Sequence, residues 1–336
     1  DRCVTCRACE TTCPSGVEYG RLVDIGRDLV EQKVPRAPWD RFRRWFLGST
    51  IPYRGVFGAG LALGRLFRPV LPSSIARKIL PRRDPGPWPA ARHARRMVAL
   101  AGCAQPSIAP GINAAAARVL DRIGITLVEA AAAGCCGAVT FHLNHQEDAL
   151  SFVKANIDAW WPHVEAGAEA IVITASGCGT MVKEYGHLMR HDPEYAAKAA
   201  RVSELARDIS EVVAAERSSI AAKVVPAPGG GKIAFHSPCS LQHGLKLSGV
   251  VEAILRDAGC ALTMVPDSHL CCGSAGTYSL LEPAISRELL ANKVAALESG
   301  APDTIATANV GCLAHIASGT RKPVRHWIEL IDQRMK

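Results

Sequence analysis

The chain has 336 residues, of which 48% are hydrophobic and 21% charged, and its formal net charge is +8. This composition excludes an intrinsically disordered protein, and the length allows two or three domains with substantial cores. The thirteen cysteines exclude a small secreted disulfide scaffold, because their number is odd, they stand in C-x-x-C and Cys-Cys-Gly groups, and no signal peptide precedes them. We therefore expect a cytoplasmic location and thiols that bind metal.

The first motif is a run of four cysteines. Residues 3–14 read C-V-T-C-R-A-C-E-T-T-C-P, which is the C-x2-C-x2-C-x3-C-P spacing of bacterial ferredoxins. Three thiolates at this spacing wrap one corner of a [4Fe-4S] cluster, and in two-cluster ferredoxins the fourth cysteine binds the other cluster. Either an upstream partner motif has been cut off or Cys3, Cys6, Cys9 and Cys13 hold one cluster alone. We favour the first alternative, since Asp1 stands only two residues before a ligand. A zinc knuckle is the less specific alternative. We assign residues 1–30 to this segment.

Residues 31–96 form a basic connector. They contain fifteen Lys or Arg against three acidic residues, a net charge of +12, so the rest of the chain carries −4. The longest apolar passage, residues 55–64, is much shorter than the ~20 residues needed to cross a bilayer. Aromatic and aliphatic residues among basic ones predict two short basic amphipathic helices, one at residues 41–47 and one over residues 65–79, where Ile75 and Ile79 alternate with Arg77 and Lys78. Such helices could lie peripherally on the inner face of the cell membrane, dock on an acidic partner, or pack as a solvated linker. No recognition motif accompanies the charge, so we expect no nucleic-acid binding.

After the connector the hydrophobic pattern becomes α/β. We predict a strand at 97–102 that leads to Cys103, a helix at 112–123, a strand at 126–129, a helix at 147–165 and a strand at 170–174 that leads to Cys178. Helices around 194–215 and a linker at Gly229–Gly231 follow. A second series then repeats the pattern, with strands at 232–235, 262–265 and 303–307 and helices at 249–258 and 284–297. We therefore predict two α/β domains, residues 97–225 and 226–336.

The repeat is above all a repeat of cysteines. A shift of 136 residues places Cys103 on Cys239 and the pair Cys135-Cys136 on Cys271-Cys272, and Cys178 falls two residues from Cys312. Adjacent cysteines seldom form a disulfide with each other, because the required Cα separation and torsions strain that ring. In each half four cysteines come from three loops at the ends of predicted strands, where open α/β sheets bind ligands.

Four converging cysteines suit an iron-sulfur site. Zinc could also take four, but zinc sites usually contain C-x-x-C pairs. Gly137 and Gly273 follow the adjacent pairs, and we expect them to let the backbone approach a cluster closely with positive φ. Cys260 lies outside the pattern and is predicted to be an ordinary core cysteine.

These motifs resemble a known family. The repeat is similar to the cysteine-rich CCG domain of the heterodisulfide reductases, and nearly the whole chain resembles the iron-sulfur subunits of glycolate oxidase (glycolate dehydrogenase). The passages that carry the second likeness are P-S-G-V-E-Y-G at 14–20, A-S-G-C-G at 175–179, T-A-N-V-G-C at 307–312 and V-R-H-W at 324–327.

The resemblance implies a fold, a function and a ligand set. The fold would be two pseudo-repeated, Rossmann-like CCG domains of α/β class, preceded by a small helical ferredoxin-type segment. The chain would relay electrons from flavin-containing oxidase subunits of the same complex to a quinone-type acceptor. The [4Fe-4S] clusters would be bound by Cys3, Cys6, Cys9, Cys13, Cys103, Cys135, Cys136, Cys178, Cys239, Cys271, Cys272 and Cys312.

One departure from the family pattern bears on the chemistry. The full CCG motif ends in C-x-x-C and supplies five thiolates, but the first cysteine of that pair is Ala175 in one half and Asn309 in the other. Four thiolates remain in each half, enough for a cubane cluster, so we expect electron transfer rather than disulfide cleavage. The alternatives are a heterodisulfide, thiol or quinone reductase subunit, the iron-sulfur subunit of a lactate or anaerobic glycerol-3-phosphate dehydrogenase, and a zinc-binding scaffold.

Histidines near the cysteine loops could be ligands, proton donors or structural polar residues. The candidates are His142, His145, His236, His269 and His315. The last three are the strongest, because each lies within three residues of a cysteine of the second half. No G-x-G-x-x-G motif follows a predicted strand, so we expect no flavin in this chain.

Overall fold

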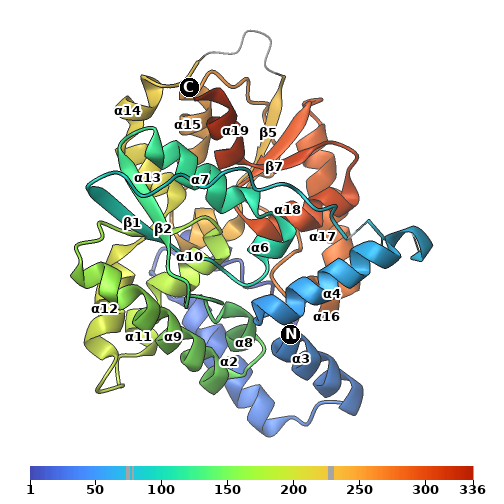
Figure 1. The fold of residues 1–336 in the computed structure, drawn as a ribbon. Helices are drawn as coiled ribbons and strands as arrows, with labels where there is room; N and C mark the ends of the chain where they lie inside the picture. Colours follow the sequence, from blue (N-terminus) through green and yellow to red (C-terminus); the bar gives the residue numbers. More distant parts are fainter. Residues whose placement is uncertain (73–75, 78, 226–230, 336) are drawn as a thin grey trace.

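The computed structural model describes residues 1–72, 76–77, 79–225 and 231–335, and it contains two parallel sheets (Figure 1). The predicted α/β class is confirmed. The first sheet has the strand order β2-β1-β3-β4, and the second has the order β5-β6-β7. Helices α2 and α3, from the N-terminal part of the chain, lie together at the lower end of the view in Figure 1.

The first sheet is formed by β1 (Arg95–Ala99), β2 (Ile125–Glu129), β3 (Ile171–Ile173) and β4 (Ala206–Asp208), and all its neighbours pair in parallel. Both faces are apolar, as a parallel sheet covered on both sides requires. The helices that follow the strands are α6 (Gln105–Ile108), α7 (Gly111–Asp121), α8 (Ala138–His142), α9 (Gln146–Glu165), α10 (Ser176–Lys183), α11 (Tyr185–Leu188), α12 (Ala196–Leu205), α13 (Ile209–Ala215) and α14 (Arg217–Ala221).

The second sheet is formed by β5 (Ile233–His236), β6 (Thr304–Thr307) and β7 (Val324–His326), again in parallel. Its helices are η2 (Ser240–Gly244), α15 (Val250–Asp257), α16 (Tyr278–Leu281), α17 (Pro283–Glu298), α18 (Val310–Gly319) and α19 (Trp327–Arg334). Of the predicted linker, Gly229 and Gly230 lie outside the described residues.

The strand predicted at 262–265 is wrong. Only Leu262 bridges to the second sheet, opposite Ile233, and the main-chain N–H of Thr263 donates to Ile233 O at 2.9 Å before the chain turns away. Pro266, which has no N–H to donate, follows within a few residues. The bridge nevertheless occupies the position that β2 has in the first sheet, so both halves place their elements in the same order.

The two halves share one apolar core. It contains Met97 and Ala99 from β1 together with Ile305 and Ala306 from β6, and a second cluster covers only the opposite face of the first sheet. Helix α19 of the second half packs on α7 of the first, and α13 of the first packs on α15 of the second. The halves therefore stabilise each other instead of folding around separate cores.

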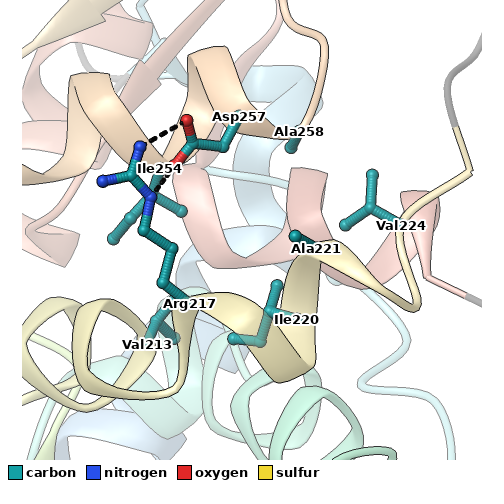
Figure 2. Close-up of a pocket in the computed structure, with 8 residues that line it drawn as sticks. All are labelled: Val213, Arg217, Ile220, Ala221, Val224, Ile254, Asp257 and Ala258. Atoms are coloured by element: carbon teal, nitrogen blue, oxygen red, sulfur yellow. Dashed lines mark hydrogen bonds and ion pairs between the residues drawn. The ribbon is translucent and has the colours of Figure 1, made fainter.

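Ion pairs reinforce this contact at the surface. Asp332 on α19 accepts from Arg118 and Arg122, each at 2.7 Å. Figure 2 shows the corresponding pair between α14 and α15, where Arg217 Nη2 lies 2.7 Å from Asp257 Oδ1 beside a small hollow. Apart from this pair, the residues that line the hollow are apolar, and none is a cysteine. It therefore belongs to the junction of the halves and not to a thiol site.

The N-terminal part is helical, as predicted. It comprises α1 (Ala8–Thr12), α2 (Tyr19–Lys33), α3 (Pro38–Thr50), α4 (Arg54–Phe67) and the short η1 (Arg68–Val70). The predicted helix around residues 41–47 is confirmed as α3. The one predicted over residues 65–79 is not formed as such, because α4 ends at Phe67, only the short η1 follows within the described residues, and Ile75 and Lys78 lie outside them. None of the described helices has both the length and the apolar character needed to cross a membrane.

Candidate metal centres

The four cysteines of the first half meet at one edge of the first sheet. Cys103 follows β1, Cys135 and Cys136 lie between β2 and α8, and Cys178 is in the first turn of α10, directly after β3. The strands are parallel, so their carboxyl ends share this edge. The thiols contact one another in series, Cys103 with Cys135, Cys135 with Cys136, and Cys136 with Cys178. The contact with Cys135 and burial raise the pKa of Cys103 well above its ordinary value.

The Cys-Cys-Gly loop of this half is fixed by two buried side chains that the sequence analysis missed. Asn156 of α9 donates to Cys135 O at 2.7 Å, and its Oδ1 accepts from the main-chain N–H of Gly134 at 2.8 Å. Tyr185 of α11 donates its hydroxyl to Cys136 O at 2.9 Å. The one sequence signal was a polar Asn156 within the apolar side of a predicted helix.

The second half repeats this arrangement. Cys239 follows β5, Cys271 and Cys272 lie in the loop before α16, and Cys312 is in the first turn of α18. Cys239 Sγ is 3.9 Å from Cys271 Sγ, and the main-chain N–H of Gly273 points to Cys271 Sγ at 3.3 Å. Gly273 has a φ of +87°, and a Cβ there would lie 2.6 Å from Ser286 O. Only glycine fits this turn, as the sequence analysis expected.

Two of the four thiols of the second pocket have lowered pKa values. Contacts with Cys239 and Cys272 lower the pKa of Cys271 to about 3. The contact with Cys272 lowers the pKa of Cys312 to about 5, and the neighbouring His236 acts in the same direction against the effect of burial. Lys293 of α17, another residue that the sequence analysis missed, is 2% exposed and interacts electrostatically with Cys272 and Cys271. Contacts with Cys271 and burial raise the pKa values of the other two thiols of this pocket, Cys239 and Cys272, and in the first pocket Cys103, Cys135 and Cys136 have raised pKa values.

Of the five candidate histidines, His236 is the one that forms a group with two cysteine sulfurs within the described residues. It is 2% exposed, and a ring nitrogen lies within 4.8 Å of the sulfurs of Cys272 and Cys312. The others lie elsewhere. His142 is exposed at the end of α8, His145 precedes α9 with Nδ1 3.8 Å from Asp148, His269 is exposed, and His315 Nε2 lies 3.2 Å from Ser286 Oγ.

The two positions that depart from C-x-x-C have different surroundings. Asn309 donates from Nδ2 to Cys312 Sγ at 3.5 Å, so it offers a hydrogen bond where the full motif has a thiolate. Ala175 is buried and lines a cavity of about 50 Å³ beside Cys103 and Cys178. Val310 of the second half lines the same cavity, which brings the two pockets close together.

The N-terminal cysteines lie against the second half. Tyr278 donates its hydroxyl to Arg2 O at 3.0 Å, and Thr11 Oγ1 lies 2.8 Å from His243 Nδ1. Burial and the charge of Cys271 raise the pKa of Cys6, which places that thiol within electrostatic range of the second pocket. Cys3 and Cys9 are exposed, and Cys6 and Cys13 are half-buried.

Comparison with known proteins agrees with this arrangement. The cysteine-rich domain family, CCG, matches residues 97–183 and 233–317, which contain the two repeated cysteine sets. The glycolate oxidase iron-sulfur subunit of Escherichia coli strain K12 is 53% identical over the whole of this chain, which covers 82% of its length. The chain belongs to the glycolate oxidase iron-sulfur subunit family.

More distant relatives of this family member include a probable glycolate oxidase iron-sulfur subunit of Bacillus subtilis strain 168. It is 26% identical over 95% of the chain and 77% of its own length. Lactate utilization protein A of Anoxybacillus flavithermus is 28% identical over 66% of the chain and 93% of its own length.

The residues present fit the iron-sulfur group that the family name implies. Soft thiolate ligands are the ones that such clusters take, and each half brings four of them into contact at a sheet edge. All thirteen cysteines are free thiols. Cys260 lies in the shared apolar core, apart from the three groups.

Proposed function

We propose that this chain is the electron-transferring subunit of a glycolate, or more generally 2-hydroxy acid, dehydrogenase complex. The observation that carries the proposal is the arrangement of three cysteine groups in series within one structure. The charge of Cys271 in the second pocket raises the pKa of Cys6 in the N-terminal group, so the two thiols lie near each other. Asn309 donates a hydrogen bond to Cys312 Sγ. Its side-chain amide also lies beside Gly177, the residue before Cys178 of the first pocket. This series supports a relay.

In this proposal each group holds one [4Fe-4S] cluster. Cys3, Cys6, Cys9 and Cys13 form the first ligand set, and the halves supply the other two, namely Cys103, Cys135, Cys136 and Cys178, and Cys239, Cys271, Cys272 and Cys312. When bound, such clusters act as one-electron carriers. The protein buries six of the eight cysteines of the two halves and half-buries Cys178 and Cys239, and main-chain N–H groups point to Cys135 and Cys271.

The domain boundaries that we propose follow the same division. Residues 1–30 carry the N-terminal ligand set, residues 31–96 form the connector, and residues 97–225 and 226–336 form the two CCG domains. The family matches at 97–183 and 233–317 fall within the last two ranges.

The proposed partners are a flavin-containing oxidase subunit and a quinone-type acceptor. The name of the Escherichia coli relative describes one subunit of a larger enzyme, which supports the first partner. The relay would begin or end near Cys3 and Cys9, whose exposure makes them accessible to another protein. Lactate is the second candidate substrate of such a complex, because lactate utilization protein A is also similar to this chain.

A reconstitution assay tests the relay. The purified holo chain is mixed anaerobically with glycolate and an electron-accepting dye, and flavin-containing subunits are then added. We expect no dye reduction by the chain alone and turnover once the flavin subunits are present. Lactate in place of glycolate tests the second substrate. Dye reduction by this chain without another subunit would contradict the proposal.

We further propose that the connector places the chain peripherally on the inner face of the cell membrane. On α3, Trp39, Phe42, Trp45 and Phe46 are exposed, and Phe42 stacks on Trp39 with ring centroids 5.5 Å apart. The other side of the connector is held to the body, where Arg65 donates to Ser107 O at 2.8 Å. Exposed aromatic rings beside arginines suit an anionic membrane surface.

Co-sedimentation with vesicles tests the membrane contact. The holo chain should sediment with vesicles that contain anionic lipid and much less with neutral ones. A Trp45→Glu variant should stay in solution, whereas Val70→Glu, which changes an exposed apolar residue outside α3 and α4, should sediment as the wild type does. Equal sedimentation of the wild type and Trp45→Glu would argue against this surface.

A further inference from the structure

We propose that His236 binds iron in the second half, so that this centre has an imidazole nitrogen among its ligands while the first centre is bound by cysteine alone. The proposal rests on the proposed function, because it assumes that the second pocket holds an iron-sulfur cluster. A [4Fe-4S] cluster takes four protein ligands, so His236 would bind in place of one of the four cysteines of this half, as a ligand that the cysteine pattern does not include.

The first observation is the position of the ring. His236 is the last residue of β5, so it stands at the sheet edge where the cysteines of this half gather. One of its nitrogens, Cys272 Sγ and Cys312 Sγ all lie within 4.8 Å of one another, and all three residues are buried. Three ligand atoms at this separation can share a metal centre.

The second observation is that the ring has no other role in the described part of the chain. Neither Nδ1 nor Nε2 of His236 makes a geometrically defined hydrogen bond there, although the residue is only 2% exposed, and the ring interacts with the thiols of Cys312 and Cys271. A polar group buried without a partner is costly, and buried polar groups are normally hydrogen-bonded or bound to a metal. A neutral imidazole has one nitrogen lone pair available to a metal, and imidazole suits iron.

The third observation is the contrast between the halves. The shift of 136 residues that superimposes the cysteines places Leu100 where the second half has His236. Leu100 is 4% exposed and lines the cavity beside Cys103 and Cys178. The first pocket therefore has an apolar side chain at this position, and the chain itself supplies the natural substitution to test.

A histidine ligand would change the electronic properties of its centre. A neutral imidazole contributes no negative charge, whereas a thiolate contributes one, and replacement of cysteine by histidine ligands raises the potential of iron-sulfur centres. The nearby Lys293, with Nζ bonded to Asp267 O at 2.8 Å, acts in the same direction, because a cation favours the more negative, reduced state. The second centre would thus be reduced more readily than the first.

Pulsed EPR of the reduced, anaerobically purified holo chain tests this ligand. We expect one nitrogen coupling as strong as that of a directly bound imidazole, and its replacement by a 15N pattern when the protein is labelled with 15N-histidine. His236→Leu should lose the coupling and retain the signals of the other two centres. His269→Gln is the matched control, because His269 is an exposed histidine two residues before Cys271, and this variant should keep the coupling.

His236→Cys covers the case in which the leucine variant does not fold. It retains a ligand atom, so we expect full iron content, no strong nitrogen coupling and a lower midpoint potential of one centre. A wild-type chain with iron but no strong nitrogen coupling would overturn the inference and leave the relay intact, and so would a coupling that persists in His236→Cys. A chain without iron would overturn both.

Discussion

Cys135 and Cys136 are neighbours in the chain, but their main-chain carbonyl groups accept hydrogen bonds from different residues. Cys135 O accepts from Asn156, and Cys136 O accepts from Tyr185, so each carbonyl is held by a different helix. Both sulfurs are then free to point at the same pocket, and each is 2% exposed. A single residue of this pair should therefore be indispensable to its centre but unimportant to the other two.

Substitution of Cys136 tests this independence. Cys136→Ser should remove the signal of the first-half cluster and about a third of the bound iron, because serine replaces one of four proposed ligands. The N-terminal and second-half signals should remain. Iron analysis and EPR of the reduced variant provide the measurement.

The control for this variant is Cys260→Ser. Cys260 is buried, at 6% exposure, as Cys136 is at 2%, but it lies in the shared core. This change should cost about 1 to 3 kcal/mol of folding free energy through burial of a hydroxyl and leave all three signals. Loss of iron from Cys260→Ser equal to that from Cys136→Ser would contradict the assignment.

The sequence predicted the cysteine groups but not all of the residues that support them. Spacing alone identified the sets, because the cysteines at strand ends repeat at matched intervals. Asn156, Tyr185 and Lys293 were missed, because each is a single polar residue in a helical segment, and its burial depends on which helix packs over which loop. For His236 the sequence left several roles open, and only the fold showed that it lies in one group with the sulfurs of Cys272 and Cys312.

At the scale of elements, the Cys-Cys-Gly loop of the first half is stabilised by helices that follow it in the chain. Tyr185 of α11 is 0% exposed, and its hydroxyl both donates to Cys136 O and accepts from Asn156 Nδ2 at 3.1 Å. Its ring stacks on Trp160 of α9 with centroids 6.4 Å apart. The phenol thus links two helices to the loop.

Removal of this hydroxyl should loosen the loop. We expect Tyr185→Phe to lower the free energy of unfolding by about 1 to 3 kcal/mol, because Cys136 O loses its buried donor. Iron should also leave the first-half centre faster in the presence of a chelator. Tyr195→Phe is the matched control, since that hydroxyl bonds Asp158 at the surface, and it should cost less than about 1 kcal/mol. Equal effects of the two variants would refute the anchoring role.

Secondary structure was predictable where a strand or helix is long enough for its apolar residues to repeat at a recognisable interval. The strands at 97–102, 126–129 and 170–174 were found at β1, β2 and β3 within a few residues. The three-residue strand β4 was placed among helices instead, because it lies between α12 and α13 and is too short for a period of two. Residues 262–265 have an apolar pattern that suits a strand, but the chain leaves the sheet after one bridge.

At the scale of the whole molecule, His326 stands where the two sheets meet. It is 0% exposed, its Nδ1 accepts from the main-chain N–H of Ile328 at 3.3 Å, and its ring interacts with the backbone of Thr174 after β3 and of Ala308 after β6. Burial lowers its pKa from 6.5 to about 4. The imidazole is therefore neutral in the folded protein at neutral pH.

This buried imidazole makes stability depend on pH. Below pH 6.5 the unfolded chain binds a proton at His326, whereas the folded chain binds it only near pH 4, so acidification through this window favours unfolding. Between pH 7.5 and 5.5 the wild type should lose about 1 kcal/mol through this residue, and His326→Gln should lack that loss. Parallel denaturant titrations of the two proteins at both pH values measure the difference.

The difference between the wild type and His326→Gln removes the contribution of other groups that titrate in this pH range. Burial raises the pKa of Asp208 to about 6, which gives the opposite slope between pH 3.8 and 6 because the folded chain keeps that proton longer. Asp208 is present in both proteins, so its contribution is the same in each. An unchanged pH slope in His326→Gln would contradict the buried, neutral histidine.

The central claim is that sulfurs from distant parts of the chain converge in three groups to hold iron. Iron and acid-labile sulfide analysis of the chain, purified without oxygen, tests it most directly. The account predicts a brown protein with about twelve iron and twelve sulfide per chain, and EPR signals from three centres on reduction. A colourless protein that contains zinc in place of iron, or no metal at all, would contradict it.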